Sequence, residues 1–111
     1  MDKDKIRMKL LELGFSPSAK GTEYIVEAVC AIDEDPDRRF NIMKGVYKLV
    51  GDRFGVNPGT VERGINQGVA AAMATSQEAI QDFIRFMPSP ISGSYKNSDF
   101  LAAFHMALHR E

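Results

Sequence analysis

The chain has 111 residues, of which 44% are hydrophobic and 26% are charged. This length is enough for one modest hydrophobic core and too short for two. The composition is that of a globular protein and argues against extensive disorder. No apolar stretch approaches the roughly 20 residues of a membrane-spanning helix, and residues 1–10 do not form a secretory signal. We therefore expect one cytoplasmic domain covering residues 1–111, with no membrane partner.

The formal net charge is −1, from 14 Lys and Arg against 15 Asp and Glu. A nucleic-acid-binding domain is usually basic, so the total alone does not favour that function. The distribution is uneven, because residues 40–74 carry four positive and two negative side chains. Residues 1–39 carry seven positive and nine negative side chains, and residues 75–111 carry three positive and four negative ones. Only the central third is therefore net positive.

Apolar residues recur at helical spacing along most of the chain, which predicts an all-α fold of about six helices. The predicted helices cover about residues 3–13, 22–32, 42–54, 58–74, 76–86 and 98–108, and residues 87–96 read as a loop. Gly14 and Gly55 end the first and third helices, and Thr22 is placed to cap the second. Asn57 is placed to cap the fourth helix, with Pro58 at its first position.

The central segment, about residues 42–74, has the spacing of a helix-turn-helix, in which a second helix projects from a tight turn. Gly51 is small where the chain approaches itself, and Gly55 can adopt the left-handed conformation that ends the first helix. Val56 can fill the underside of the turn. An ordinary helical hairpin with a glycine stop has the same periodicity, so the spacing leaves both interpretations open.

The residues on the outer face of the helix at about 58–74 favour DNA binding over an ordinary helical hairpin. Val61, Ile65, Val69, Ala72 and Met73 cluster toward the core, and the opposite side carries Thr60, Arg63 and Gln67, flanked by Glu62 and Asn66. Arginine can pair guanine, asparagine or glutamine can pair adenine, and glutamate can accept from cytosine. Lys44, Lys48 and Arg53 suit phosphates. The alternative is a solvated polar face, which most surface helices have.

The sequence contains no arrangement typical of a catalytic site, and we expect no enzyme, cofactor or metal. Cys30 lies among apolar residues and reads as a buried thiol. The acidic run at residues 33–37 resembles the start of a calcium loop, but Arg38 and Lys44 stand where glycine and glutamate are needed. His105 and His109 are four residues apart and could share a metal on a helix, yet no third ligand is identifiable.

Four runs in order along the chain carry a family resemblance: Lys20-Gly21 to Tyr24 with Glu27-Ala28, Ile42 to Lys44 with Tyr47, Val61-Glu62-Arg63 with Ile65, and Asn97-Ser98-Asp99-Phe100. Together they resemble the DNA-binding effector domain of the stage-zero sporulation response regulator. The similarity covers nearly the whole chain, and its most specific parts are the Val-Glu-Arg and Asn-Ser-Asp-Phe runs.

The resemblance implies a six-helix bundle whose third and fourth helices read promoter boxes in duplex DNA as tandem copies, with an RNA polymerase sigma subunit as a further partner. It implies that Arg63 contacts guanine and Glu62 the cytosine side, and Asn57 matches a threonine cap. The expected DNA-binding residues are Glu62, Arg63, Asn66, Gln67, Thr60, Gly59, Asn57 and Lys44. Such regulators carry a receiver domain, and we expect none in 111 residues, whether the chain is an excised domain or a stand-alone relative.

The chain also departs from the family pattern. Asn66 and Gln67 replace arginine and histidine, and Gly59 replaces serine, which predicts fewer phosphate contacts. Gly64 and Gly68 replace alanines, each costing on the order of 1 kcal/mol in helix propensity, and Met73 replaces tryptophan, so the sequence predicts a looser reading helix. These departures keep a second hypothesis open, a helical protein-interaction module of the same fold that has weak or lost DNA binding.

Overall fold

A computed structural model describes residues 1–75 and 97–110, and all the regular secondary structure in this part of the chain is helical, with no strand. The elements are α1 (Lys3–Glu12), α2 (Lys20–Glu34), the 3₁₀-helix η1 (Pro36–Phe40), the π-helix η2 (Met43–Tyr47), α3 (Lys48–Phe54), α4 (Pro58–Thr75) and α6 (Asn97–His109). The predicted all-α class is confirmed. The helix predicted at 76–86 and the loop predicted at 87–96 lie outside the described residues. Within the described ranges, none of the helices combines the length and the apolar character needed to cross a membrane.

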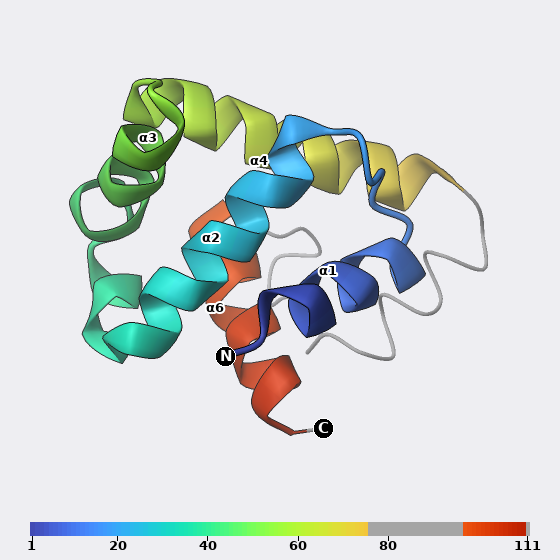
Figure 1. Cartoon of the computed structure of the whole chain (residues 1–111), viewed down its shortest axis with the longest axis horizontal. Helices are drawn as coiled ribbons and strands as arrows, with labels where there is room; N and C mark the ends of the chain where they lie inside the picture. Colours follow the sequence, from blue (N-terminus) through green and yellow to red (C-terminus); the bar gives the residue numbers. More distant parts are fainter. Residues whose placement is uncertain (76–96, 111) are drawn as a thin grey trace.

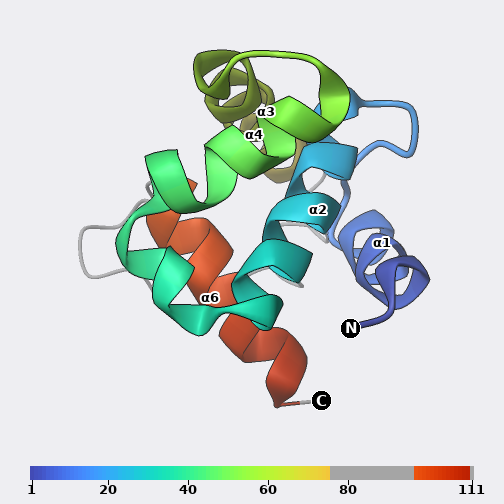
Figure 2. The ribbon, with the colours of Figure 1, turned by 60° about the vertical axis from the view of Figure 1, so that its left-hand side comes forward.

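Helix α2 runs through the middle of the molecule, between α1 on one side and α6 on the other, and α4 crosses its first turns (Figures 1 and 2). Its central position follows from its sequence, because it buries apolar side chains around most of its circumference. Its buried apolar residues are Tyr24, Ile25, Val26, Ala28, Val29, Ala31 and Ile32. Phe100 and Phe104 of α6 and Ile6 and Leu10 of α1 complete the core around it.

The start of α2 differs from the sequence prediction. The helix begins at Lys20 after Ala19, with no side-chain cap, and Thr22 lies inside its first turn. The Thr22 hydroxyl is buried and donates to the carbonyl oxygen of Ser16 at 2.7 Å. The prediction that Thr22 caps this helix was therefore wrong, because its hydroxyl holds the preceding turn instead of the helix N-terminus.

Charged side chains pair along the line where α1 packs on α2, which we call the α1–α2 seam and define by Lys3, Arg7, Glu23 and Glu27. The Arg7 guanidinium donates to both Glu23 carboxylate oxygens, at 2.8 and 2.7 Å, and the Lys3 ammonium donates to Glu27 at 2.8 Å. The hydrogen bonds from Arg7 lower the pKa of Glu23 below its usual range. Planar two-point pairing of this kind fixes the relative position of the two helices.

Helices α2 and α4 cross at two glycines. A Cβ atom added to Gly21 would collide with the carbonyl oxygen of Gly64, and one added to Gly64 would lie 2.7 Å from the Tyr24 ring. Glycine is therefore required here by close packing of two backbones. The prediction that Gly64 makes a looser helix overlooked this contact, since the glycine that lowers helix propensity also permits the crossing.

Candidate nucleic-acid interface

The first helix of the central segment is not a plain α-helix. The backbone is helical from Ile42 onward, but its first part, η2, is π-helical, with the Lys48 N–H donating to the Met43 carbonyl oxygen five residues earlier. Periodicity predicted one regular helix over 42–54 and gave no sign of this wider turn. Val46, Tyr47 and Val50 are buried, whereas Lys44 and Lys48 are exposed on the outside.

Three residues, 55–57, form the turn between α3 and α4. Gly55 adopts the left-handed conformation, with φ 71° and ψ 31°, and ends α3 as predicted. The N–H of Val56 then donates to the Gly51 carbonyl oxygen at 2.9 Å. A Cβ atom on Gly51 would lie 2.5 Å from the Val56 carbonyl oxygen, so Gly51 is small because the turn folds back on it. The conformation of this turn therefore depends on both glycines.

Asn57 caps the start of α4. Its side-chain oxygen accepts from the Thr60 N–H at 2.8 Å and from the Thr60 hydroxyl at 3.1 Å. Pro58 follows at the first helical position, where its missing N–H costs nothing. Asn57 thus stabilises the first turn of α4 through its two hydrogen bonds from Thr60.

The two faces of α4 have opposite character. Val61, Ile65 and Ala72 are buried against the rest of the molecule. Arg63, Asn66 and Gln67 are exposed, and Gly59, Thr60 and Glu62 are half-buried at the edges. We call Arg63, Asn66 and Gln67 the outer face of α4. The structure places the sequence-predicted residues of this helix on or beside one side, as helical periodicity requires.

Arg63 and Glu62 are neighbours in the sequence with different surroundings. The Arg63 guanidinium is exposed and donates to the Thr60 hydroxyl at 3.3 Å. Glu62 is half-buried, and its charge adds to the effect of burial in raising the pKa of Tyr47. The Tyr47 hydroxyl is buried and makes no hydrogen bond within the described residues. Arg63 therefore extends outward from the edge of α4, while Glu62 lies toward the element that carries Tyr47.

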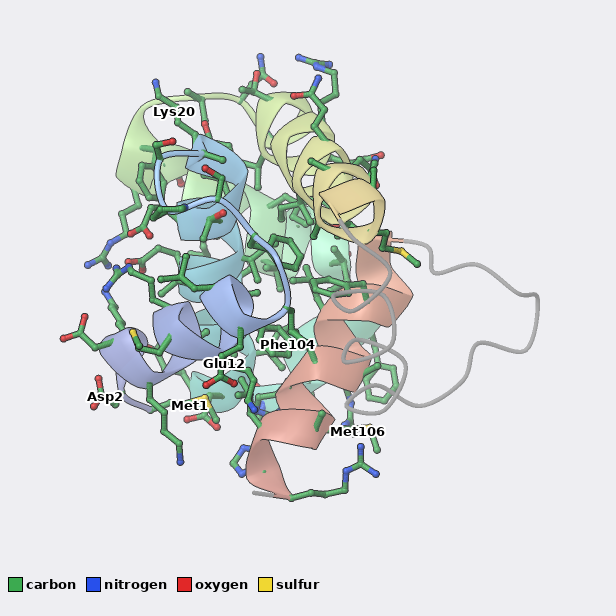
Figure 3. All side chains as sticks on the ribbon, turned by 90° about the vertical axis from the view of Figure 1, so that its right-hand side faces the viewer. Met1, Asp2, Glu12, Lys20, Phe104 and Met106 are labelled. Carbon is green, nitrogen blue, oxygen red and sulfur yellow. The ribbon has the colours of Figure 1, made fainter. Side chains whose placement is uncertain are left out.

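A groove separates the start of α2 from the exposed side of α4. It is lined by Lys20 and Tyr24 from α2 and by Thr60, Arg63 and Gln67 from α4, among others. Lys20 is exposed and extends outward at the same end of the molecule as α3 and α4 (Figure 3). Sequence reasoning did not include Lys20 in the site, because only the crossing of α2 and α4 brings it beside Arg63.

The cations expected to meet phosphates are not equivalent. Lys48 forms an ion pair with Asp52 at 3.7 Å, and Arg53 forms one with Glu27 of α2 at 3.3 Å. Both charges are thus partly neutralised within the protein. Lys44 is exposed on η2. Lys44 and Lys20 are accordingly better candidates for an anionic partner than Lys48 and Arg53.

Residues 6–108 match the family described as sporulation initiation factor Spo0A, C terminal. The chain belongs to this family. Spo0A C-terminal domains are DNA-binding transcription regulators of sporulation, and theirs is not an enzyme family. A search of curated proteins gives no match. The region shared with the Spo0A family runs from α1 into α6, so it includes the turn and both faces of α4.

Cys30, which the sequence predicts as a buried thiol, is only partly buried in the structure. The thiol is half-buried beside Glu27, and burial, followed by the Glu27 charge, raises its pKa. A thiol with a raised pKa is a poor nucleophile at neutral pH. Burial and the Glu27 charge thus favour the protonated thiol, although Lys3 and the N-terminal amine act in the opposite direction.

Proposed function

We propose that this protein binds duplex DNA sequence-specifically as a regulator of sporulation genes, and that residues 42–75 act as a helix-turn-helix within a six-helix bundle. Helix α4 is the recognition helix and enters the major groove. The observation that carries the proposal is the polar outer face of α4, directly after a turn fixed by Gly51, Gly55 and Asn57. The whole chain then serves as a single effector domain.

Arg63 is the main base-reading residue in this proposal. Its exposed guanidinium has two parallel N–H donors that match the O6 and N7 acceptors of guanine. Glu62 accepts from the cytosine amino group at the flank of the same contact. Asn66 and Gln67 lie about one turn further along α4, where their amides can pair adenine.

Phosphate contacts orient the recognition helix. The N-terminus of α4, at Asn57, Gly59 and Thr60, offers backbone N–H groups and the positive end of the helix dipole. Lys44 on η2 and Lys20 on α2 supply further positive charge. Because Asn66 and Gln67 replace the arginine and histidine of the family pattern, we expect fewer ionic contacts than in other family members.

The proposal includes two further partners, which the family resemblance suggests. Tandem copies of the domain would occupy neighbouring promoter boxes, and an RNA polymerase sigma subunit would be contacted by the bound protein. Both partners belong to the same proposal and fail with it if no duplex is bound.

The test is selection of bound sites from random duplexes, followed by binding of the enriched site to Arg63→Ala. We expect the substitution to weaken binding by about 1–3 kcal/mol, roughly 5- to 150-fold, and to relax the preference for one guanine. Arg110→Ala removes an exposed charge at the far end of α6 and is the matched control. Unchanged affinity and base preference in Arg63→Ala would contradict the role of this helix.

A protein-interaction module is the second candidate function. It is favoured by the net charge of −1 and by the exposed apolar side chains of Phe40, Met43 and Leu49 along η1, η2 and α3. Salt separates the two functions, because a DNA binder loses affinity steeply as counterions are released. The interaction module is the better description if no duplex is bound even at low salt.

A further inference from the structure

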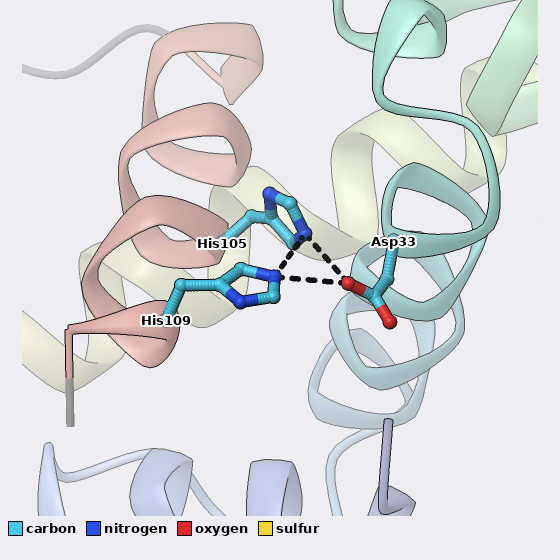
Figure 4. A group of neighbouring side chains, drawn as sticks. All are labelled: Asp33, His105 and His109. Carbon is cyan, nitrogen blue, oxygen red and sulfur yellow. Dashed lines mark hydrogen bonds and ion pairs between the residues drawn. The ribbon is translucent and has the colours of Figure 1, made fainter.

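Three side chains from two distant parts of the sequence converge at the end of the molecule opposite α3 and α4. Asp33 lies in the last turn of α2, and His105 and His109 lie one turn apart on α6 (Figure 4). The Nε2 atoms of His105 and His109 are 3.1 and 2.9 Å from Asp33 Oδ1, and they are 3.1 Å from each other. These three atoms form a nearly equilateral triangle.

Hydrogen bonds alone cannot satisfy this triangle. An Nε2 atom carries either a proton or a lone pair. If both are protonated, both donate to an ionised Asp33, and two N–H groups then face each other at the His–His contact. If one has lost its proton, its lone pair faces the carboxylate oxygen. In every protonation state of the two histidines with ionised Asp33, at least one of the three contacts is unfavourable.

A metal ion satisfies all three contacts, because each atom then directs a lone pair at a common centre. Nitrogen and carboxylate ligands lie about 2.1 Å from zinc, so two of them are about 3.0 Å apart at a right angle and about 3.4 Å apart at the tetrahedral angle. The observed separations of 2.9–3.1 Å agree with the first value. The ligand atoms therefore already fit right-angle coordination, and their separations would grow by about 0.3–0.5 Å for the tetrahedral geometry that zinc usually adopts.

We propose that Asp33, His105 and His109 bind a divalent transition-metal ion such as zinc. Imidazole and carboxylate are the ligands that such ions accept, whereas magnesium prefers oxygen ligands alone. The set supplies three protein ligands, so water completes the coordination. His105 and His109 have the i, i+4 spacing that places two ligands on one helix face.

The surroundings of the three ligands suit ion entry and ligand orientation. The side chains of His105, Asp33 and His109 are 8%, 26% and 55% exposed, so the site has a buried wall and an open side. The second carboxylate oxygen of Asp33 lies 3.6 Å from the Met1 amine, which leaves Oδ1 for the ion. A contact of this kind orients a ligating carboxylate.

The position of the site indicates a structural role. Asp33 and Lys20 lie at opposite ends of α2, about 20 Å apart at 1.5 Å per residue. A bound ion would join the end of α6 to the end of α2 without contacting the proposed DNA-binding surface. The proposal therefore stands whether or not the protein binds DNA.

The experiment is titration of the untagged, metal-free chain with zinc, followed by the imidazole NMR signals and by thermal unfolding. The chain has only two histidines, so every imidazole signal reports on this site. We expect both histidines to shift together and saturate near one equivalent of zinc. The melting temperature should rise by roughly 10 °C when free zinc exceeds its Kd about 100-fold, and magnesium should have no effect.

Variants separate this site from adventitious binding. His109→Gln changes an exposed side chain and Asp33→Asn keeps the shape of the carboxylate, so both should fold and lose at least about 100-fold in zinc affinity. Cys30→Ser and Glu34→Gln remove nearby ligands outside the triangle and should bind as the parent does. The proposal is overturned if the histidine signals do not respond to zinc, if Asp33→Asn binds normally, or if Cys30→Ser abolishes binding.

Discussion

The α1–α2 seam and the outer face of α4 use charge in opposite ways. In the seam, Lys3 and Arg7 are each paired with a glutamate of α2 at 2.7–2.8 Å. On the outer face, Arg63 contacts a hydroxyl at 3.3 Å and is exposed. Carboxylates in the seam are thus occupied by internal pairs. The net charge of −1 is a total over the whole chain and does not give the local charge at the outer face.

The largest expected effect comes from breaking the crossing that holds the two regions together. In Gly21→Ala the new methyl group meets the Gly64 carbonyl oxygen, so α2 and α4 must separate. We expect a loss of about 1–3 kcal/mol in the free energy of unfolding, measured by denaturant titration. Gly68→Ala is the control, since its methyl group would lie 3.6 Å from the Phe15 ring, an ordinary contact.

Gly68→Ala should instead gain up to about 1 kcal/mol, because alanine is the better helix former. A neutral Gly21→Ala would mean that the crossing accommodates a methyl group at this position. Equal losses in the two variants would mean that the crossing is no more sensitive to a methyl group than the position of Gly68.

A smaller effect is expected from Lys20→Gln, which tests whether the groove beside α4 contributes charge to DNA binding. Removing one phosphate contact lowers the slope of log K against log salt by about 0.9. Base preference should not change, because phosphate contacts carry no sequence information. The measurement is the affinity for the selected duplex at several salt concentrations.

Lys5→Gln is the matched control, because Lys5 is also exposed but lies on α1. The same slope change in both variants would show that only total charge matters. An unchanged slope in Lys20→Gln would remove Lys20 from the interface.

The smallest effect is expected in the seam, and it depends on pH. Arg7 lowers the pKa of Glu23, so this carboxylate stabilises the folded protein at pH values above its unfolded value, near 4.5. That stabilisation is lost as the pH falls through the lower, folded pKa. Between pH 7 and pH 3 the parent chain should therefore lose more stability than Glu23→Gln.

Denaturant unfolding at the two pH values measures this difference. Parallel losses in both proteins would show that the Arg7 pair contributes no stability.

Much of the outer face of α4 could be predicted from sequence because it depends on local rules. Helical periodicity separates Val61 and Ile65 from Arg63, and the Asn57-Pro58 pair marks the helix start. Gly55 similarly predicts the left-handed stop of α3. Each of these signals lies within a few residues of its effect.

Features that depend on tertiary contacts were not predictable. The sequence predicts Thr22 as a helix cap, because it does not show that the Thr22 hydroxyl donates to the carbonyl oxygen of Ser16. Asp33 was assigned to an acidic run because its two histidine partners lie 72 and 76 residues away. Lys20 joins the groove only through the crossing of α2 and α4. For the same reason, the sequence did not identify Asp33 as a third ligand of the proposed metal site or Lys20 as part of the groove beside α4.

The contact between Gly21 and Gly64 also limits how geometry can be transferred between relatives. In a relative with alanine at position 64, that methyl group would have to displace the ring of residue 24 or widen the angle between the two helices. Either change moves the residue equivalent to Lys20 relative to the one equivalent to Arg63. A DNA complex of such a relative, superimposed on α4 alone, would therefore misplace the phosphate contacts that we propose for Lys20 in this protein.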